Sequence, residues 1–175
     1  MEILSSVSTF NCFHDYNMIL QIPCQRIISG GQTGVDRGAL DACLDMNFPC
    51  GGTCPKNRLA EDGTIPQKYP LTEAQESTYE FRTRQNVIKS DGTLILSGVE
   101  LTGGTLLTSE LAQKLEKPFL IISPEDSPDT VLNWITNLNI KILNAAGPRE
   151  SEWPEAYEFS YQFFTKLIQQ IRKSY

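Results

Sequence analysis

Residues 26–40 read RIISGGQTGVDRGAL. A run rich in β-branched residues leads into glycines at positions 30, 31 and 34, and from Val35 onward apolar residues recur with a period near 3.6. The pattern predicts a short strand, a tight glycine turn and the N-terminus of a helix. Backbone N–H groups and the positive end of the helix dipole face the space above such a turn, so it is typical of sites that bind anions, most often phosphate.

The glycine spacing separates this turn from two nucleotide-binding motifs. It is neither Gly-x-Gly-x-x-Gly, which is followed by an acidic residue for the ribose, nor Gly-x-x-x-x-Gly-Lys-Ser/Thr. A plain strand-to-helix turn is the alternative. Three glycines together with two polar residues exceed what a plain turn needs. We therefore expect an anion to be held by Gly30, Gly31, Gln32, Thr33 and Gly34.

The composition predicts one soluble globular domain. The chain has 175 residues, of which 40% are hydrophobic and 21% charged, and its formal net charge is −6. Such an acidic chain is not expected to bind nucleic acid or a membrane surface in general. No apolar run approaches the roughly 20 residues that span a bilayer. Without the pattern of a secretory signal at its start, the protein is expected to be cytoplasmic.

The positions of cysteine and histidine disfavour metal binding and histidine catalysis. The five cysteines match no zinc-binding spacing, and the single histidine, His14, lies in a segment expected to be peripheral. The cysteines are interpreted as reduced thiols. A reactive or ligand-binding Cys50 or Cys54 is the minor alternative, because both lie in a glycine-rich loop.

Short apolar strands alternate with longer amphipathic helices from residue 26 onward. Strands are expected near 26–29, 48–51, 93–96, 119–122 and 140–143, and helices near 35–45, 74–88, 105–116, 128–138 and 156–172. This alternation predicts an α/β fold with a parallel sheet and helices on both faces. Residues 1–25 are expected to form an N-terminal extension, 26–175 a single domain, and 53–72 a long irregular loop.

The loops that follow three of the strands are expected to meet, because ligands bind at the carboxyl ends of the strands in such sheets. The first is the glycine turn, the second holds Ser97 and residues 101–105, and the third is 144–151. Two of them open helices and expose backbone donors. The candidate donors there are Gly103, Gly104, Thr105 and Arg149, with Lys56, Asn57 and Arg58 from the long loop and Arg82, Thr83 and Asn86 from the helix before the third strand.

Cations gathered at one edge of an acidic protein indicate a specific anionic small molecule as ligand. The alternative for each cation is a solvated surface residue. For Arg149 we favour the ligand, and the alternative there is a salt bridge to Glu150 or Asp36. Asp36 is expected to stabilise a helix N-terminus. Glu110 is either a general base or a solvated helix residue.

Several segments together resemble the putative molybdenum carrier family, a group of Rossmann-like proteins related to the lysine-decarboxylase-like cytokinin-activating enzymes. The resemblance covers nearly all of residues 26–175. It rests on residues 30–41, 54–56 with 58 and 60–63, 65–66 with 69–71, 82–83 with 86–87, 90–95, 101–105 and 146–151.

This resemblance implies a Rossmann-like three-layer sandwich that carries the molybdenum cofactor, a molybdate-bearing pterin with a terminal phosphate. The carrier would shield the cofactor from oxidation and deliver it to molybdoenzymes without catalysis, as a homodimer or homotetramer. Residues 30–34 and 103–105 would hold the anionic groups, with Arg149 and Ser151 nearby. Molybdate, phosphate or a sulfate-like oxyanion could take the place of the cofactor.

An enzyme of the same fold group is the second hypothesis, namely a nucleoside monophosphate phosphoribohydrolase. Those enzymes typically carry Pro-Gly-Gly-x-Gly-Thr-x-x-Glu with a catalytic Glu. Gly103, Gly104 and Glu110 keep this spacing, but Leu106 and Leu107 replace the second Gly and the Thr. This loss weakens the phosphate cradle, so the enzyme ranks behind the carrier. A nucleotide-sensing module is the third hypothesis.

Overall fold

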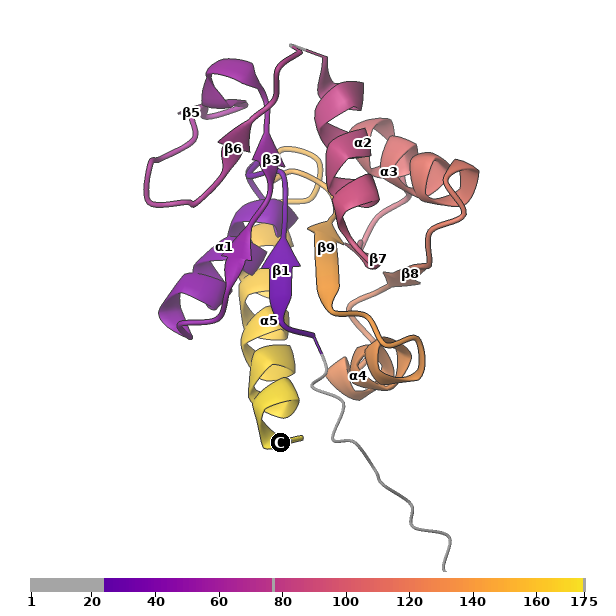
Figure 1. Cartoon of the computed structure of the whole chain (residues 1–175). Helices are drawn as coiled ribbons and strands as arrows, with labels where there is room; N and C mark the ends of the chain where they lie inside the picture. The colour runs from indigo at the N-terminus through magenta and orange to yellow at the C-terminus, as the bar shows by residue number, and fades with distance from the viewer. Residues whose placement is uncertain (1–23, 77, 175) are drawn as a thin grey trace, which may run out of the picture.

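The computed structural model describes residues 24–76 and 78–174, which form a five-stranded parallel sheet with helices on both faces (Figure 1). The order of the strands in the sheet is β2-β1-β9-β7-β8, and every neighbouring pair is parallel. The strands are β1 (Arg26–Ile28), β2 (Cys50–Gly51), β7 (Gly92–Leu96), β8 (Phe119–Ile122) and β9 (Ile142–Ala146). The expected Rossmann-like α/β fold is confirmed.

Five α-helices cover the two faces of the sheet. They are α1 (Val35–Asp45), α2 (Tyr79–Lys89), α3 (Gly103–Lys114), α4 (Pro128–Asn137) and α5 (Ala156–Lys173). Helices α1, α4 and α5 share one apolar core with β1, β7 and β9, whereas α2 and α3 pack on each other around Val87 and Leu111 (Figure 1). The hydroxyl of Ser160 in α5 donates to the carbonyl of Val35, 2.8 Å away, and ties α5 to the start of α1.

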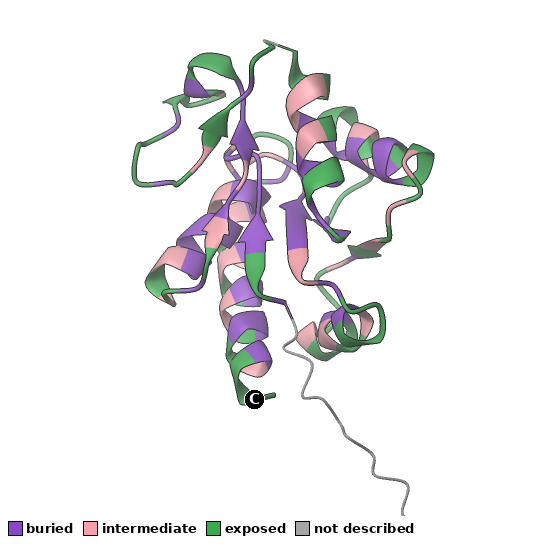
Figure 2. Ribbon diagram, viewed as in Figure 1, coloured by how far each residue is buried: buried purple, intermediate pink, exposed green. Residues whose placement is uncertain are grey.

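The buried residues lie in the central strands and on the helix faces that contact one another or the sheet (Figure 2). All five residues of β7 are buried, as are four of the five in β9, which suits central strands that are covered on both faces. Along α5, the buried apolar side chains recur every three or four residues and face α1 and α4. Phe164 and Leu167 have no exposed surface at all.

The long loop between β2 and α2 is more ordered than expected. It contains β3 (Thr53–Cys54), the 3-10 turn η1 (Lys56–Arg58), β4 (Leu59–Ala60), β5 (Gly63–Thr64) and β6 (Thr72–Glu73). Strands β4 and β5 form an antiparallel hairpin, and β3 pairs with β6 in parallel. These strands have two residues each, which is too short for a period-2 pattern to reveal them.

Several element boundaries differ from the prediction, among them those of β2, which begins at Cys50 rather than near 48. Helix α2 begins at Tyr79 rather than near 74, because the Thr78 side chain accepts a hydrogen bond from the Phe81 N–H and caps the helix there. Helix α3 begins two residues early, at Gly103. Strand β9 lies two residues later than expected, because residues 139–141 still belong to the turn after α4, in which Asn139 has a φ of 53°.

Membrane-spanning helices and metal-binding clusters are both absent from the described residues. Of the helices in 24–76 and 78–174, none is both long and apolar enough to cross a membrane. The same residues contain no cluster of His, Cys, Asp and Glu that could hold a metal ion. The expected N-terminal extension and His14 lie outside the described residues, apart from Cys24 and Gln25 at the end of that extension.

Candidate functional site

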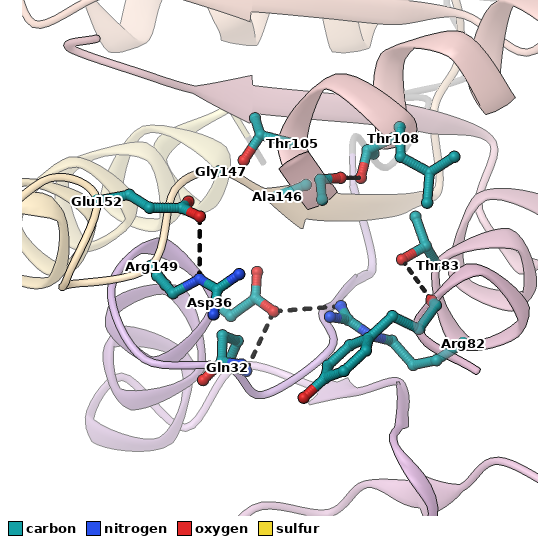
Figure 3. Close-up of a pocket in the computed structure, with 13 residues that line it drawn as sticks. Gln32, Asp36, Arg82, Thr83, Thr105, Thr108, Ala146, Gly147, Arg149 and Glu152 are labelled. Atoms are coloured by element: carbon teal, nitrogen blue, oxygen red, sulfur yellow. Dashed lines mark hydrogen bonds and ion pairs between the residues drawn. The ribbon is translucent and has the colours of Figure 1, made fainter. Parts of the chain in front are cut away.

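A pocket of about 280 Å³ lies at the carboxyl ends of β1 and β9, between α2 and α3 (Figure 3). The loops after β1, β7 and β9 meet there, as their position at one edge of a parallel sheet requires. Its lining consists of Gln32, Asp36, Tyr79, Arg82, Thr83, Gly104, Thr105, Leu107, Thr108, Ala146, Gly147, Arg149 and Glu152.

Arg82 is the least satisfied polar group of this pocket. Its side chain is only 15% exposed, and its buried Nε atom has no hydrogen-bond partner among the described residues. Its Nη1 atom lies 3.6 Å from the Oδ2 atom of Asp36, an ion-pair distance too long for a good hydrogen bond. Gly30 makes room for it, because a Cβ atom at Gly30 would lie 1.9 Å from Nη1. A buried guanidinium with unused donors favours an additional anionic partner.

Asp36 lies opposite Arg82 on the first turn of α1 (Figure 3). Its carboxylate accepts a hydrogen bond from the Gln32 N–H, at 3.2 Å, and is almost fully buried. Burial raises the pKa of this carboxyl above its usual value, and the charge of Arg82 opposes that rise only in part. Asp36 thus supports the helix start, as expected, and also places an acidic group on the wall of the pocket.

The backbone donors at the start of α1 are largely used within the chain. The Thr33 N–H donates to the side-chain oxygen of Gln32 at 3.0 Å, and the Val35 N–H donates to the carbonyl of Pro148 at 3.2 Å. Together with the bond from Gln32 to Asp36, these contacts occupy three backbone donors of the turn that was expected to hold the anion. Of the five residues predicted there, only Gln32 lines the pocket.

The start of α3 is more accessible than the start of α1. Among the described residues no side chain caps this helix, and Thr102, Gly103 and Gly104 are all exposed. No atom lies within 4 Å of the place that a Cβ atom at Gly104 would occupy. Because the first N–H groups of a helix have no partner within the helix, this end can present backbone donors to a ligand in the pocket.

Arg149 lies between the pocket and the β4–β5 hairpin. Its Nε atom is 3.1 Å from Glu152 Oε1 and 3.8 Å from Glu61 Oε2. Neither of the two partners considered from the sequence, Glu150 and Asp36, pairs with it; Glu150 instead accepts a hydrogen bond from the Tyr157 N–H at 2.9 Å. The Arg149 side chain is 40% exposed, so it remains accessible to a ligand.

Several other predicted site residues have structural contacts outside this pocket. Arg58 is buried and donates to the carbonyls of the long loop, Asn86 bonds to both the N–H and the carbonyl of Thr53, and Ser97 donates to the carbonyl of Val99. Lys56 is exposed in η1. Of the candidates named from the sequence, the pocket brings together Gln32, Arg82, Thr83, Gly104, Thr105 and Arg149.

The remaining lining residues were missed as pocket residues by sequence reasoning, although Asp36 and Gly147 were noted in it. Tyr79, Arg82 and Thr83 share one face of α2, and Gly104, Thr105 and Thr108 share one face of α3, which is the helical spacing of three and four that could have found them. The hydroxyls of Thr83 and Thr108 donate to carbonyls of their own helices, at 2.9 and 2.8 Å. Arg82, Arg149 and backbone N–H groups are therefore the main donors available to an anion.

Glu110 lies outside this arrangement. It is exposed on α3 and does not line the pocket, whereas Gly104, Thr105, Leu107 and Thr108 of the same helix do. A general base must reach the reacting atoms to within hydrogen-bond distance, directly or through one water. The position of Glu110 therefore gives no support to a catalytic role at this pocket.

Comparison with known proteins agrees with this description. Residues 27–168 match the model of the circularly permutated YpsA SLOG family. The crystal structure of a putative molybdenum carrier protein from Syntrophus aciditrophicus SB is 42% identical and superposes with a TM-score of 0.80, covering 83% of this chain and 96% of that one. No curated protein matches the chain. The chain belongs to the circularly permutated YpsA SLOG family and to the putative molybdenum carrier proteins.

Proposed function

We propose that this protein binds the molybdenum cofactor in the pocket between α2 and α3, protects it and delivers it to molybdoenzymes without catalysis. The observation that carries the proposal is Arg82, a largely buried cation whose buried Nε atom has no partner among the described residues. The relative from Syntrophus aciditrophicus carries the name of a molybdenum carrier, which supports a molybdenum compound as the cargo.

The anionic end of the cofactor is the part that suits this pocket. Arg82, Arg149 and the start of α3 offer guanidinium and backbone N–H donors, which phosphate and molybdate oxygens both accept. The volume of about 280 Å³ lies just below the roughly 300 to 1,000 Å³ that small-molecule sites enclose. We therefore place one oxyanion of the cofactor inside and the remainder of the pterin toward the opening, where Tyr79 is 54% exposed.

The proposal is tested by calorimetric titration of the protein with anaerobically prepared molybdenum cofactor. Arg82→Ala removes the cation of the pocket and is expected to weaken binding by about 10- to 100-fold, the usual range for hydrogen bonds to a charged group. Arg84→Ala is the matched control, because Arg84 lies two residues away on the same helix and is exposed. Equal affinities of both variants and the native protein would exclude this pocket as the cofactor site.

The enzyme hypothesis is tested in the same series with adenosine monophosphate. A carrier is expected to bind the cofactor and to release no base from the nucleotide. Base release that is abolished by Glu110→Gln would instead establish a phosphoribohydrolase. The position of Glu110 outside the pocket favours the first result.

A further inference from the structure

The carboxylate of Glu61 occupies a set of anion donors at the edge of the pocket. Glu61 forms the tip of the β4–β5 hairpin, and its Oε1 atom accepts hydrogen bonds from the Thr33 hydroxyl and from the Ser151 N–H, the latter at 3.2 Å. Its Oε2 atom accepts from the Ser151 hydroxyl and lies 3.8 Å from Arg149 Nε. Two hydroxyls, one backbone N–H and one guanidinium therefore surround a single carboxylate.

The donors come from two loops that are far apart in the sequence. Thr33 follows β1, whereas Arg149 and Ser151 follow β9. The Thr33 oxygen accepts the Glu150 N–H at 3.2 Å, which leaves its hydroxyl hydrogen directed at Glu61. The same donors would therefore be oriented toward any anion that replaced the carboxylate.

The hairpin that carries Glu61 is held by polar contacts more than by apolar packing. Leu59 is 51% exposed, and Gly63 and Thr64 are exposed as well. The backbone N–H of Glu61 donates to the side-chain oxygen of Gln32 at 3.0 Å, and the neighbouring Asp62 accepts two hydrogen bonds from Arg37 at 2.8 and 3.0 Å. The Asp62 contact can keep the hairpin in place while the Glu61 side chain leaves.

We propose that Thr33, Arg149 and Ser151 form a second oxyanion subsite, which Glu61 keeps closed as an internal substitute for the ligand and which an incoming tetrahedral oxyanion opens by displacing that carboxylate. The proposal rests on the proposed function only for the identity of the anion. The cofactor carries two anionic groups, and this subsite adjoins the pocket through Arg149, which belongs to both. An anion that must displace Glu61 binds with an apparent affinity equal to its intrinsic affinity multiplied by the fraction of molecules in which Glu61 has left the subsite.

The subsite is probed with inorganic sulfate, measured by calorimetric titration. Glu61→Ala removes the competitor and is expected to raise sulfate affinity on the order of tenfold, and Glu61→Gln, which keeps the shape but not the charge, is expected to raise it less. Glu116→Gln is the control for net charge, because Glu116 is exposed beyond the far end of α3. It is expected to leave the affinity unchanged.

Adding Thr33→Val and Ser151→Ala to the Glu61→Ala variant distinguishes the subsite from the pocket. If the subsite holds the sulfate, the gain disappears in the combined variant. A gain that persists would assign the sulfate to the pocket and overturn the proposal, as would an affinity that does not change in Glu61→Ala. Failure of the proposed function has a different signature, because the native protein would then bind no cofactor while the Glu61→Ala variant would still gain sulfate affinity.

Discussion

The carboxylate of Asp36 and the guanidinium of Arg82 lie 3.6 Å apart in the wall of the pocket, where Asp36 is buried and the Arg82 side chain is only 15% exposed. An oxyanion that approaches Arg82 therefore meets an acidic group as well as a cation. Because burial raises the pKa of Asp36, its carboxyl takes up a proton at a higher pH than an ordinary aspartate. Protonation of Asp36 removes its repulsion of the oxyanion, so that the charge of Arg82 is available to attract the ligand.

We accordingly predict that sulfate binds more tightly as the pH falls through the raised pKa of Asp36. Sulfate itself does not titrate over this range, so the effect reports on the protein. Affinity measured between about pH 8 and about pH 4.5 should rise toward the acidic end in the native protein and stay nearly constant in Asp36→Asn. Glu61 does not mimic this behaviour, because its hydrogen bonds lower its pKa and it titrates at a lower pH. A native affinity independent of pH would contradict the prediction.

Gly104 offers a way to block the pocket without unfolding the protein. The place that its Cβ atom would occupy is open, and the residue lies in the first turn of α3. Gly104→Ala should therefore preserve or raise the free energy of unfolding, by up to about 1 kcal/mol, while the added methyl group weakens cofactor binding.

Gly147→Ala provides the contrast, since its Cβ atom would lie 2.4 Å from the carbonyl oxygen of Leu96. That variant should lose stability as well as binding. Denaturant unfolding and calorimetry on both variants separate the two effects. Full binding by Gly104→Ala would show that the ligand does not approach the start of α3.

Arg58 is predicted to stabilise the long loop instead of binding the ligand. Its guanidinium donates to the carbonyls of Ile65, Pro66, Tyr69 and Leu71, at 2.9 to 3.1 Å. Arg58→Ala leaves these buried or partly buried carbonyls without their donor and is expected to cost about 3 kcal/mol. Arg58→Lys should restore little, because an ammonium group lacks the planar fork that reaches several carbonyls at once. Thermal unfolding and limited proteolysis of residues 53–74 measure the effect; cofactor affinity lost at unchanged stability would contradict it.

The thiols are predicted to differ sharply in reactivity. The Cys43 thiol donates a hydrogen bond that lowers the pKa of Cys50, which is partly exposed, and the charge of Arg26 lowers it further. Burial raises the pKa of Cys24 to about 12, and the side chain has no exposed surface. In a Cys12→Ser background, iodoacetamide near pH 8 should alkylate Cys50 first and leave Cys24 unmodified.

Peptide mapping by mass spectrometry measures this order. Arg26→Gln should slow the reaction at Cys50. Labelling of Cys24 at the rate of Cys50 in the folded protein would contradict the assigned burial.

Elements with a clear apolar period could be predicted from the sequence. The bounds of α1 and β8 match their expected ranges at both ends, because amphipathic spacing and a continuous apolar run are local signals. The hairpin that carries Glu61 could not be predicted in this way. Its strands are two residues long, and Glu61 binds Ser151, 90 positions away. No local pattern encodes such a pairing.

The candidate site shows the same division between local and long-range information. That the loops after β1, β7 and β9 meet at one edge follows from a parallel sheet, so Arg149 and Gly104 could be placed there in advance. From the sequence, Arg58 and Arg82 are equal candidates for binding an anion. In the structure, Arg58 is surrounded by backbone carbonyls, whereas the Nε atom of Arg82 lacks a partner among the described residues. Only the packing of the long loop and of α2 separates them.

The position of β9 has a consequence for how the protein is made. This strand is fifth of the five along the chain, but it lies between β1 and β7 and is the only link between them in the sheet. A ribosome must therefore synthesise residues up to 146 before the two halves of the sheet can join. Ala146 and Gly147, which line the pocket, are made at the end of that strand. The pocket therefore cannot form on a nascent chain that ends before residue 152, because Arg149 and Glu152 also line it.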